Sequence, residues 1–183
     1  MSAFDSFVSG VLQREKGYVN NPKDRGGETN FGITAETARR NGFTGNMRDL
    51  TRDQAILIYK LEYWERPGFD RIEAISPKIA EKLLDIGVNM GPLKYPGLFL
   101  QRCLNVLNRE GKDYPDIVVD GVLGPASRSA LTAFLAKRKK DGGEDVLIGM
   151  LQALQSVRYI EIAEANQSQE EFSFGWAKRA LGV

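Results

Sequence analysis

Residues 76–92 read SPKIAEKLLDIGVNMGP. A serine followed by a proline is typical of a helix start, with Ser76 as the N-cap and Pro77 in the first turn. The glycine and proline at the other end of the segment are typical helix stops. Between them, the apolar residues that recur at helical spacing are Ile79, Leu83, Ile86 and Met90. The segment therefore predicts an amphipathic helix at the centre of the fold.

The same pattern predicts helices on both sides of this segment. Thr51 with Gln54, and Ser168 with Glu171, form capping boxes that mark two helix starts. The predicted helices cover about residues 2–16, 34–42, 51–64, 96–108, 125–137, 144–166 and 168–180. Residues 17–32 lose the helical period, and their Asn, Asp, Gly and Pro residues indicate a loop with a small β-hairpin. We expect a mainly α fold.

A polar, turn-rich stretch at residues 109–124 indicates a boundary between two parts of the chain. We expect a first region at residues 1–108 and a helical subdomain at residues 109–183. No long linker rich in Ser, Gly or Pro separates them, so the two should pack into a single compact unit. An apolar stripe in the last predicted helix favours the core over a ligand platform, and its members are Phe172, Trp176 and Leu181.

The composition excludes several classes of function. The 183 residues include 25 Lys and Arg, 24 Asp and Glu, one Cys and no His. A Ser-His-Asp triad, a Cys-His dyad and a histidine-based zinc site are therefore excluded, and we expect no metal or cofactor. The net charge of +1 argues against nucleic acid as a partner. Because the chain lacks a long apolar run and a signal-peptide pattern, we expect synthesis in the cytoplasm without stable membrane insertion.

Glu15 continues the apolar stripe of the first predicted helix. It lies four residues after Val11 and seven after Val8, so a helix here directs its carboxyl group along the core-facing side. Loss of hydration would raise the pKa of such a group, which could then act as a general acid near neutral pH. The alternative is that Glu15 turns to solvent or pairs with Arg14 or Lys16.

The loop that follows carries a second carboxylate and two hydroxyl groups. Asp24 lies nine residues after Glu15, and Thr29 and Thr34 follow it. A carboxylate or hydroxyl opposite an acid is the arrangement that glycoside hydrolysis requires. The alternatives are that Asp24 stabilises its own turn, and that the two threonines serve a strand and a helix N-cap.

Residues 15–34, EKGYVNNPKDRGGETNFGIT, resemble the N-terminal signature of glycoside hydrolase family 108. This family comprises phage and prophage N-acetylmuramidases, including the group once called secretion activator proteins. Further segments that fit the same family are Tyr63-Trp64 and residues 85–91, 100–101, 119–125 and 172–176. The resemblance thus runs through most of the chain.

The resemblance implies a lysozyme-like helical fold that cleaves the β-1,4 bond between N-acetylmuramic acid and N-acetylglucosamine in peptidoglycan. The essential glutamate of the family's Glu-Gly-Gly-Tyr motif corresponds to Glu15, and Lys16 stands where the motif has its first glycine. Asp24 and Thr29 lie within one residue of the spacing that other phage lysozymes use, so we expect them to assist Glu15. The sequence leaves an inverting or a retaining outcome open.

Aromatic and amide side chains are the expected sugar contacts, because pyranose rings stack on aromatic faces and N-acetyl groups need directional hydrogen bonds. The expected substrate-binding residues are Tyr18, Asn20, Thr34, Tyr63, Trp64, Asn89 and Gln101. Asp85 lies four residues before Asn89 on the central helix, where it could face the same side or form a buried structural hydrogen bond. Residues 109–183 resemble the peptidoglycan-binding region that accompanies this catalytic domain.

We therefore expect a peptidoglycan hydrolase of the endolysin type. Its partner would be the glycan strands of peptidoglycan, it would act as a monomer in the periplasm or cell wall, and a holin or similar system would export it from the host cytoplasm. The alternatives are a wall-binding module without catalysis, a muramidase that serves toxin secretion, and a lytic transglycosylase.

Overall fold

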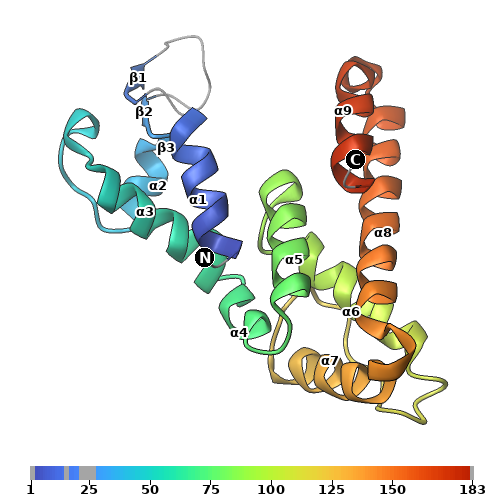
Figure 1. The fold of residues 1–183 in the computed structure, drawn as a ribbon. Coiled ribbons are helices and arrows are strands. Elements are labelled where there is room, and N and C mark those ends of the chain that lie inside the picture. The colour runs from blue at the N-terminus through green and yellow to red at the C-terminus, as the bar shows by residue number, and fades with distance from the viewer. Residues whose placement is uncertain (1–2, 15–16, 21–27, 182–183) are drawn as a thin grey trace. The chain divides into compact units, whose positions relative to one another are not determined.

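The computed structural model describes residues 3–14, 17–20 and 28–181 (Figure 1). Contacts within the chain group it into two compact units, Met1–Pro67 and Gly68–Val183. The described residues are mainly helical, with one small antiparallel sheet after the first helix, which confirms the predicted fold class. The predicted boundary between residues 108 and 109 stays a prediction.

The first unit consists of short helices around the small sheet (Figure 1). Its described elements are α1 (Ala3–Arg14), β1 (Val19–Asn20), β2 (Glu28–Asn30), β3 (Ile33–Thr34), α2 (Ala35–Arg40), the 3₁₀ turn η1 (Met47–Asp49), α3 (Arg52–Lys60) and the π-helical turn η2 (Leu61–Glu65). Thr34 caps α2, and both hydrogen bonds of the predicted Thr51–Gln54 capping box open α3. These helix starts are confirmed.

The sheet has three strands, in the order β1-β2-β3, where the sequence predicted a single hairpin. The added hairpin joins β2 to β3 through Phe31 and Gly32, whose φ angles are 52° and 74°. Two successive positive φ angles are typical of the tight turn that matches the twist of paired strands. The hairpin was missed because β3 is too short to show a period of two.

The second unit is entirely helical in its described residues. Its elements are α4 (Phe69–Glu73), α5 (Pro77–Met90), α6 (Tyr95–Leu107), α7 (Pro125–Arg138), η3 (Lys139–Asp141), α8 (Gly143–Ala165), η4 (Gln167–Gln169) and α9 (Glu170–Leu181). Ser76 caps α5 as predicted, through a 3.1 Å hydrogen bond from the Ile79 N–H. Helix α4 was not predicted, because five residues after a glycine are too few to reveal a helical period.

The start of the last helix differs from the prediction. Asn166, and not Ser168, accepts the capping hydrogen bond, and it does so from the Ser168 N–H at the start of η4. The Ser168 hydroxyl itself donates to Asn166 Oδ1 at 2.9 Å. Ser168, the predicted N-cap, lies within η4 (residues 167–169), and α9 begins only at Glu170.

The core of the second unit comes from the faces that the sequence predicted. Ile79, Leu83 and Ile86 of α5 are fully buried. They are joined by other fully buried aliphatic residues, which are Leu100, Leu104, Leu131, Leu147 and Leu151. Removing these side chains from water supplies the main favourable term in folding this unit.

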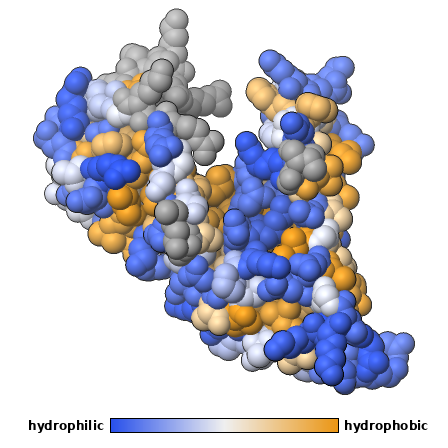
Figure 2. All heavy atoms as spheres, in the orientation of Figure 1, coloured by the Kyte–Doolittle hydropathy of each residue, from blue (hydrophilic) through white to orange (hydrophobic). Residues whose placement is uncertain are grey.

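The predicted core stripe of α9 is not core. Phe172 is 50% exposed and Leu181 is 57% exposed. The rings of Phe172 and Trp176 stack at 6.0 Å, and Trp176 stacks on Tyr159 of α8 at 5.1 Å. The surface of the α8–α9 pair consequently carries apolar patches (Figure 2). The stripe packs through Trp176 on α8, while Phe172 and Leu181 remain exposed to solvent.

Close backbone packing joins α6 to the loop that precedes α7. Gly97 of α6 lies against Gly121, whose φ is 84°. Any side chain at Gly97 would overlap the Gly121 backbone. A glycine is thus required on the helix for the loop to approach. Among the helices that the structure describes, none has the length and apolar character needed to cross a membrane.

Candidate active site

Helix α1 positions the chain immediately before Glu15. Its buried residues Phe4 and Val8 face the core of the first unit, and the Phe4 ring lies 6.0 Å from that of Trp64. Phe7 contacts the rings of Tyr59 and Tyr63 at 6.1 and 6.0 Å. The predicted core-facing side of α1 is therefore confirmed up to Leu12. Glu15 and Lys16 lie outside the described residues, so the role of Glu15 stays a prediction.

The sheet brings two of the predicted site residues together. Thr29 of β2 pairs with Thr34 of β3 and, on its other side, with Val19 of β1. Directly paired residues of antiparallel strands place their side chains on the same face. Thr29 thus occupies the middle of the sheet beside Thr34. Asp24 belongs to the connection between β1 and β2, outside the described residues.

The two threonines have different hydrogen bonds. The Thr34 hydroxyl accepts from the Thr37 N–H at 3.2 Å and donates to Thr37 Oγ1 at 3.0 Å, so it is occupied in starting α2. No hydrogen bond to the Thr29 hydroxyl is found within the described part of the chain. The geometry therefore favours the N-cap alternative for Thr34, while the catalytic role of Thr29 stays a prediction.

Two side-chain hydrogen bonds fix β2 and its turn to elements outside the sheet. The buried Asn30 amide donates to the Met47 carbonyl at 2.6 Å, which ties β2 to η1. The Tyr59 hydroxyl of α3 donates to the Phe31 carbonyl at 2.8 Å, at the strained turn between β2 and β3. Sequence reasoning missed both contacts, because they join residues 17 and 28 positions apart.

Tyr18 precedes the first strand, and Asn20 is its last residue. The Arg48 guanidinium lies 4.0 Å from the centre of the Tyr18 ring, which covers one face of the ring by a cation–π contact. Tyr18 is half-buried, and a sugar could stack only on the other face. Asn20 pairs with Glu28 through its backbone. The orientation of the Asn20 side chain lies outside what the structure describes.

Tyr63 and Trp64 belong to the aromatic cluster beneath α1. Trp64 is 4% exposed, which favours a core role over a sugar platform. Tyr63 is half-buried, and burial, together with the neighbouring charge of Glu62, raises the pKa of its hydroxyl. Tyr63 therefore stays neutral and can donate a hydrogen bond at neutral pH.

Glu62 is a buried carboxylate that sequence reasoning missed. It accepts hydrogen bonds from Asn41 at 2.7 Å and Arg66 at 2.8 Å, and it forms an ion pair with Arg40 at 3.4 Å. Burial alone would raise the pKa of Glu62, but the hydrogen bonds from Asn41 and Arg40 and the two guanidinium charges together lower it. A carboxylate held ionised in this way is unsuited to donate a proton. The Glu62–Arg66 spacing of four residues was the available sequence signal.

Asn89 lies in the second unit within a polar network. Its amide donates to the Asp85 backbone carbonyl at 2.7 Å, and Arg179 of α9 donates to its side-chain oxygen. Asp85 also accepts from Lys82 at 3.0 Å and from the buried Gln155 at 3.1 Å. The network joins α5 to α8 and α9, and it favours the structural alternative for Asp85.

Gln101 is 1% exposed, and its amide holds the loop before α7. Its nitrogen donates to Asp120 at 2.8 Å and Val122 at 3.0 Å, and its oxygen accepts from the Gly121 N–H at 2.8 Å. The hydrogen bond from Gln101 lowers the pKa of the Asp120 carboxyl. This geometry favours a structural role for Gln101, while sugar contact by Asn89 or Gln101 stays a prediction.

No group of three or more His, Cys, Asp or Glu residues suited to a metal ion occurs within the described ranges. Cys103 is buried, and burial raises the pKa of its thiol to about 11. A thiol with so high a pKa is not ionised at neutral pH and is a poor nucleophile. Among the described groups of the first unit, the arrangement can offer the Thr29 hydroxyl and the Tyr63 hydroxyl to a substrate.

Two family models match successive parts of the chain. Residues 8–91 match the model described as glycosyl hydrolase 108, and residues 95–181 match the model described as a predicted peptidoglycan domain. The solved structure titled "Structure of Brucella abortus SagA" is similar at 25% identity and a TM-score of 0.61, covering 97% of this chain and 88% of that one. No curated protein matches the chain.

Proposed function

We propose, on the premise that residues 8–91 belong to glycosyl hydrolase family 108, that this chain is an N-acetylmuramidase. The family and the peptidoglycan domain make it a peptidoglycan-acting glycoside hydrolase. The bond proposed for cleavage is the β-1,4 bond between N-acetylmuramic acid and N-acetylglucosamine. The observation that carries this proposal is the match over residues 8–91, which spans Glu15, Asp24 and the sheet residue Thr29 together.

In the proposed reaction Glu15 is the general acid. Its proton passes to the glycosidic oxygen, the bond from that oxygen to C1 of N-acetylmuramic acid breaks, and N-acetylglucosamine leaves with a free 4-hydroxyl group. Water adds to C1 and gives a new reducing end on N-acetylmuramic acid. Asp24 receives the proton of the water or first attacks C1 itself, and the Thr29 hydroxyl assists from β2.

The test is digestion of purified peptidoglycan by the wild type and by Glu15→Gln, followed by mass spectrometry of the released muropeptides. We expect new reducing-end N-acetylmuramic acid from the wild type and none from Glu15→Gln. Glu36→Gln is the matched control, because Glu36 is an exposed first-turn residue of α2 in the same unit. Circular dichroism must show that all three proteins are folded.

Three other outcomes would replace this proposal. Products that are lighter by the mass of one water and carry 1,6-anhydro ends would indicate a lytic transglycosylase. Binding to sacculi without any released product from the wild type would indicate a wall-binding module that does not cleave. Reducing-end N-acetylglucosamine would indicate a glycosidase of the other bond in the glycan strand.

The biological setting proposed for this activity is phage-induced lysis of the host cell. The protein would be made as a monomer in the host cytoplasm, leave it through a holin or similar export system, and act in the periplasm or cell wall. Expression in host cells with and without a holin tests this setting, and lysis should require both proteins. Lysis by the chain alone, or toxin release without lysis, would overturn it.

A further inference from the structure

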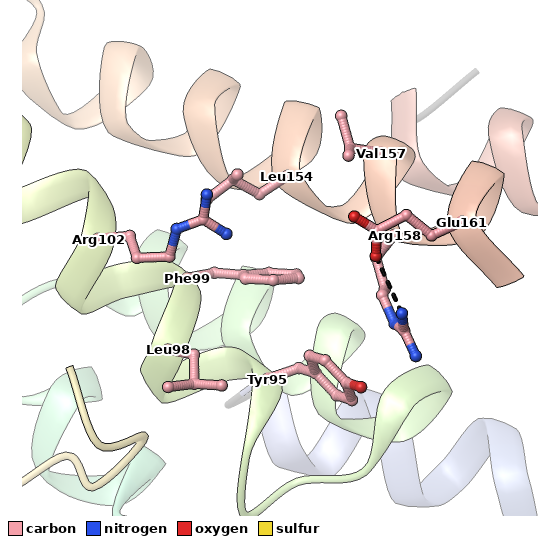
Figure 3. Close-up of a pocket in the computed structure, with 8 residues that line it drawn as sticks. All are labelled: Tyr95, Leu98, Phe99, Arg102, Leu154, Val157, Arg158 and Glu161. Carbon is pink, nitrogen blue, oxygen red and sulfur yellow. Dashed lines mark hydrogen bonds and ion pairs between the residues drawn. The ribbon is translucent and has the colours of Figure 1, made fainter.

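A small pocket lies between α6 and α8 of the second unit (Figure 3). It has a volume of about 200 Å³. Each helix contributes four residues at the spacing i, i+3, i+4, i+7, which is one continuous helix face. The lining residues are Tyr95, Leu98, Phe99 and Arg102 from α6, and Leu154, Val157, Arg158 and Glu161 from α8.

The walls of the pocket are apolar and aromatic. The rings of Tyr95 and Phe99 lie 5.8 Å apart, and Phe99 is 5% exposed. Leu98, Leu154 and Val157 supply aliphatic surface around them. Besides its two arginines and one glutamate, the lining has a single polar side-chain group, the Tyr95 hydroxyl.

Two guanidinium groups lie at opposite ends of the pocket, with the Phe99 ring between them (Figure 3). Arg158 donates to Glu161 at 2.9 Å, and its Cζ lies 5.0 Å from the centre of the Tyr95 ring. The Arg158 Nε is buried and makes no hydrogen bond to any described residue. A buried donor of this kind is destabilising until an acceptor reaches it.

Arg102 makes no hydrogen bond or ion pair with the described residues, in contrast to Arg158. The lining carries two guanidinium groups and one carboxylate, Glu161, and thus a net positive charge. Guanidinium groups bind carboxylates through paired hydrogen bonds, and the planar fork of arginine favours this geometry. The pocket accordingly combines an apolar, aromatic middle with a guanidinium group at each end.

We propose that this pocket binds the peptide stems of peptidoglycan, through a free carboxylate at Arg102, a second acceptor of the stem at Arg158, and a small aliphatic side chain against Tyr95 and Phe99 between them. The inference rests on the proposed function, because it takes peptidoglycan as the substrate. The size supports a peptide, since 200 Å³ holds one or two small residues and is below the size of typical pockets for larger ligands. The pocket lies within residues 95–181, the part matched by the peptidoglycan domain. Its proposed role is therefore to hold the protein on the cell wall, and not to cleave the glycan.

The test is a titration of the full chain with three soluble probes, followed by nuclear magnetic resonance or calorimetry. The probes are a synthetic stem tetrapeptide, the same peptide with every carboxyl group amidated, and a peptide-free chitin oligosaccharide. We expect the free peptide to bind, and amidation to weaken its binding by about tenfold because charged hydrogen bonds are lost. Equal binding of both peptides, or no binding of either, would overturn the proposal.

Arg102→Gln should weaken binding of the free peptide by about tenfold. Lys140→Gln is the matched control, since it removes one exposed positive charge from the same unit away from the pocket, and it should leave binding unchanged. Arg102→Lys keeps the charge without the planar fork and should bind at an intermediate strength. Wild-type binding by Arg102→Gln would overturn the proposal, as would displacement of the peptide by equimolar inorganic phosphate, which indicates a general anion site.

The peptide titration and the muropeptide digestion can fail independently, so the pocket assignment and the proposed function are tested separately. The stem peptide contains no glycosidic bond, so its titration gives the same answer whether or not the chain cleaves glycan. If the wild type releases no muropeptides but binds the peptide, the muramidase proposal fails and the pocket assignment holds. If it cleaves peptidoglycan but Arg102→Gln weakens oligosaccharide binding and spares peptide binding, the pocket is a sugar subsite and this inference is wrong.

Discussion

The backbones of Gly97 and Gly121 touch: a β-carbon on Gly97 would lie 1.9 Å from the Gly121 carbonyl oxygen. Both partners at this contact are backbone atoms, so no flexible side chain can move aside. Gln101, one turn further along α6, accepts the N–H of the same Gly121 at 2.8 Å. The loop before α7 is therefore held to α6 by a steric fit and by a hydrogen bond.

Gly97→Ala should destabilise the protein by about 3 kcal/mol, because overpacking forces the helix and the loop apart. Gly149→Ala is the matched control, since a β-carbon at Gly149 in α8 meets nothing within 4 Å. That change should stabilise the protein by about 0.5 kcal/mol through the better helix propensity of alanine. Thermal unfolding followed by circular dichroism measures both, and equal melting temperatures for the two variants would contradict the close contact.

Gln101→Met should cost about 3 kcal/mol, because it leaves the buried Gly121 N–H and the polar groups around Asp120 without their partner. At a temperature where the variant is folded, we expect hydrolysis of peptidoglycan to continue at the wild-type rate. A lower melting temperature with unchanged activity would assign Gln101 a structural role and not a sugar contact. An unchanged melting temperature with weaker binding of an oligosaccharide would restore Gln101 as a sugar contact.

Glu62→Gln should make stability less dependent on pH. The pKa of Glu62 is lower in the folded protein than its ordinary value of 4.5. The ionised group therefore stabilises the fold above pH 4.5, and this contribution is lost as the pH falls through the lower folded pKa. The variant should lose about 2 kcal/mol at pH 7 through the charged hydrogen bonds to Arg66 and Asn41, and should differ little from the wild type at pH 2. Urea unfolding across this range, with Glu36→Gln as control, measures the effect.

Tyr59→Phe should lower both stability and activity. It removes the hydrogen bond to the Phe31 carbonyl, which should cost about 1 kcal/mol and loosen the turn between β2 and β3. Tyr114→Phe loses an equivalent bond, 2.8 Å to the Leu104 carbonyl, in the other unit. If the sheet positions Thr29 for catalysis, kcat falls in Tyr59→Phe and is retained in Tyr114→Phe. Equal kcat values in the two variants would count against that role.

Local signals accounted for most of the helices. The Thr51–Gln54 capping box and the Ser76–Pro77 pair act within a few residues, so a reader of the sequence can recognise them. The turn at Phe31 could not be found in this way, because a hydroxyl 28 residues away supports its strained conformation. Long-range contacts of this kind decide where short strands form, and they leave no periodic pattern.

The site was harder to predict than the fold, for a reason that Gln101 and Trp64 illustrate. Amide and aromatic side chains suit both a sugar and the interior of the protein. Sequence position alone does not distinguish an exposed glutamine from one that uses its amide within the core. The pocket between α6 and α8 was overlooked for the same reason, since Leu154 and Val157 follow a spacing that indicates a core helix.

The fit between Gly97 and Gly121 also determines how hybrid enzymes can be assembled from this chain. A crossover between residues 108 and 109 would take α6 from one parent and the loop before α7 from another. The backbones at Gly97 and Gly121 would then come from different proteins, and their close contact would depend on two sequences that did not evolve together. A crossover at residues 67–68, between the two units, keeps the Gly97–Gly121 contact, the core of α5 and the pocket between α6 and α8 in one parent, and recombination with other wall hydrolases should succeed more often there.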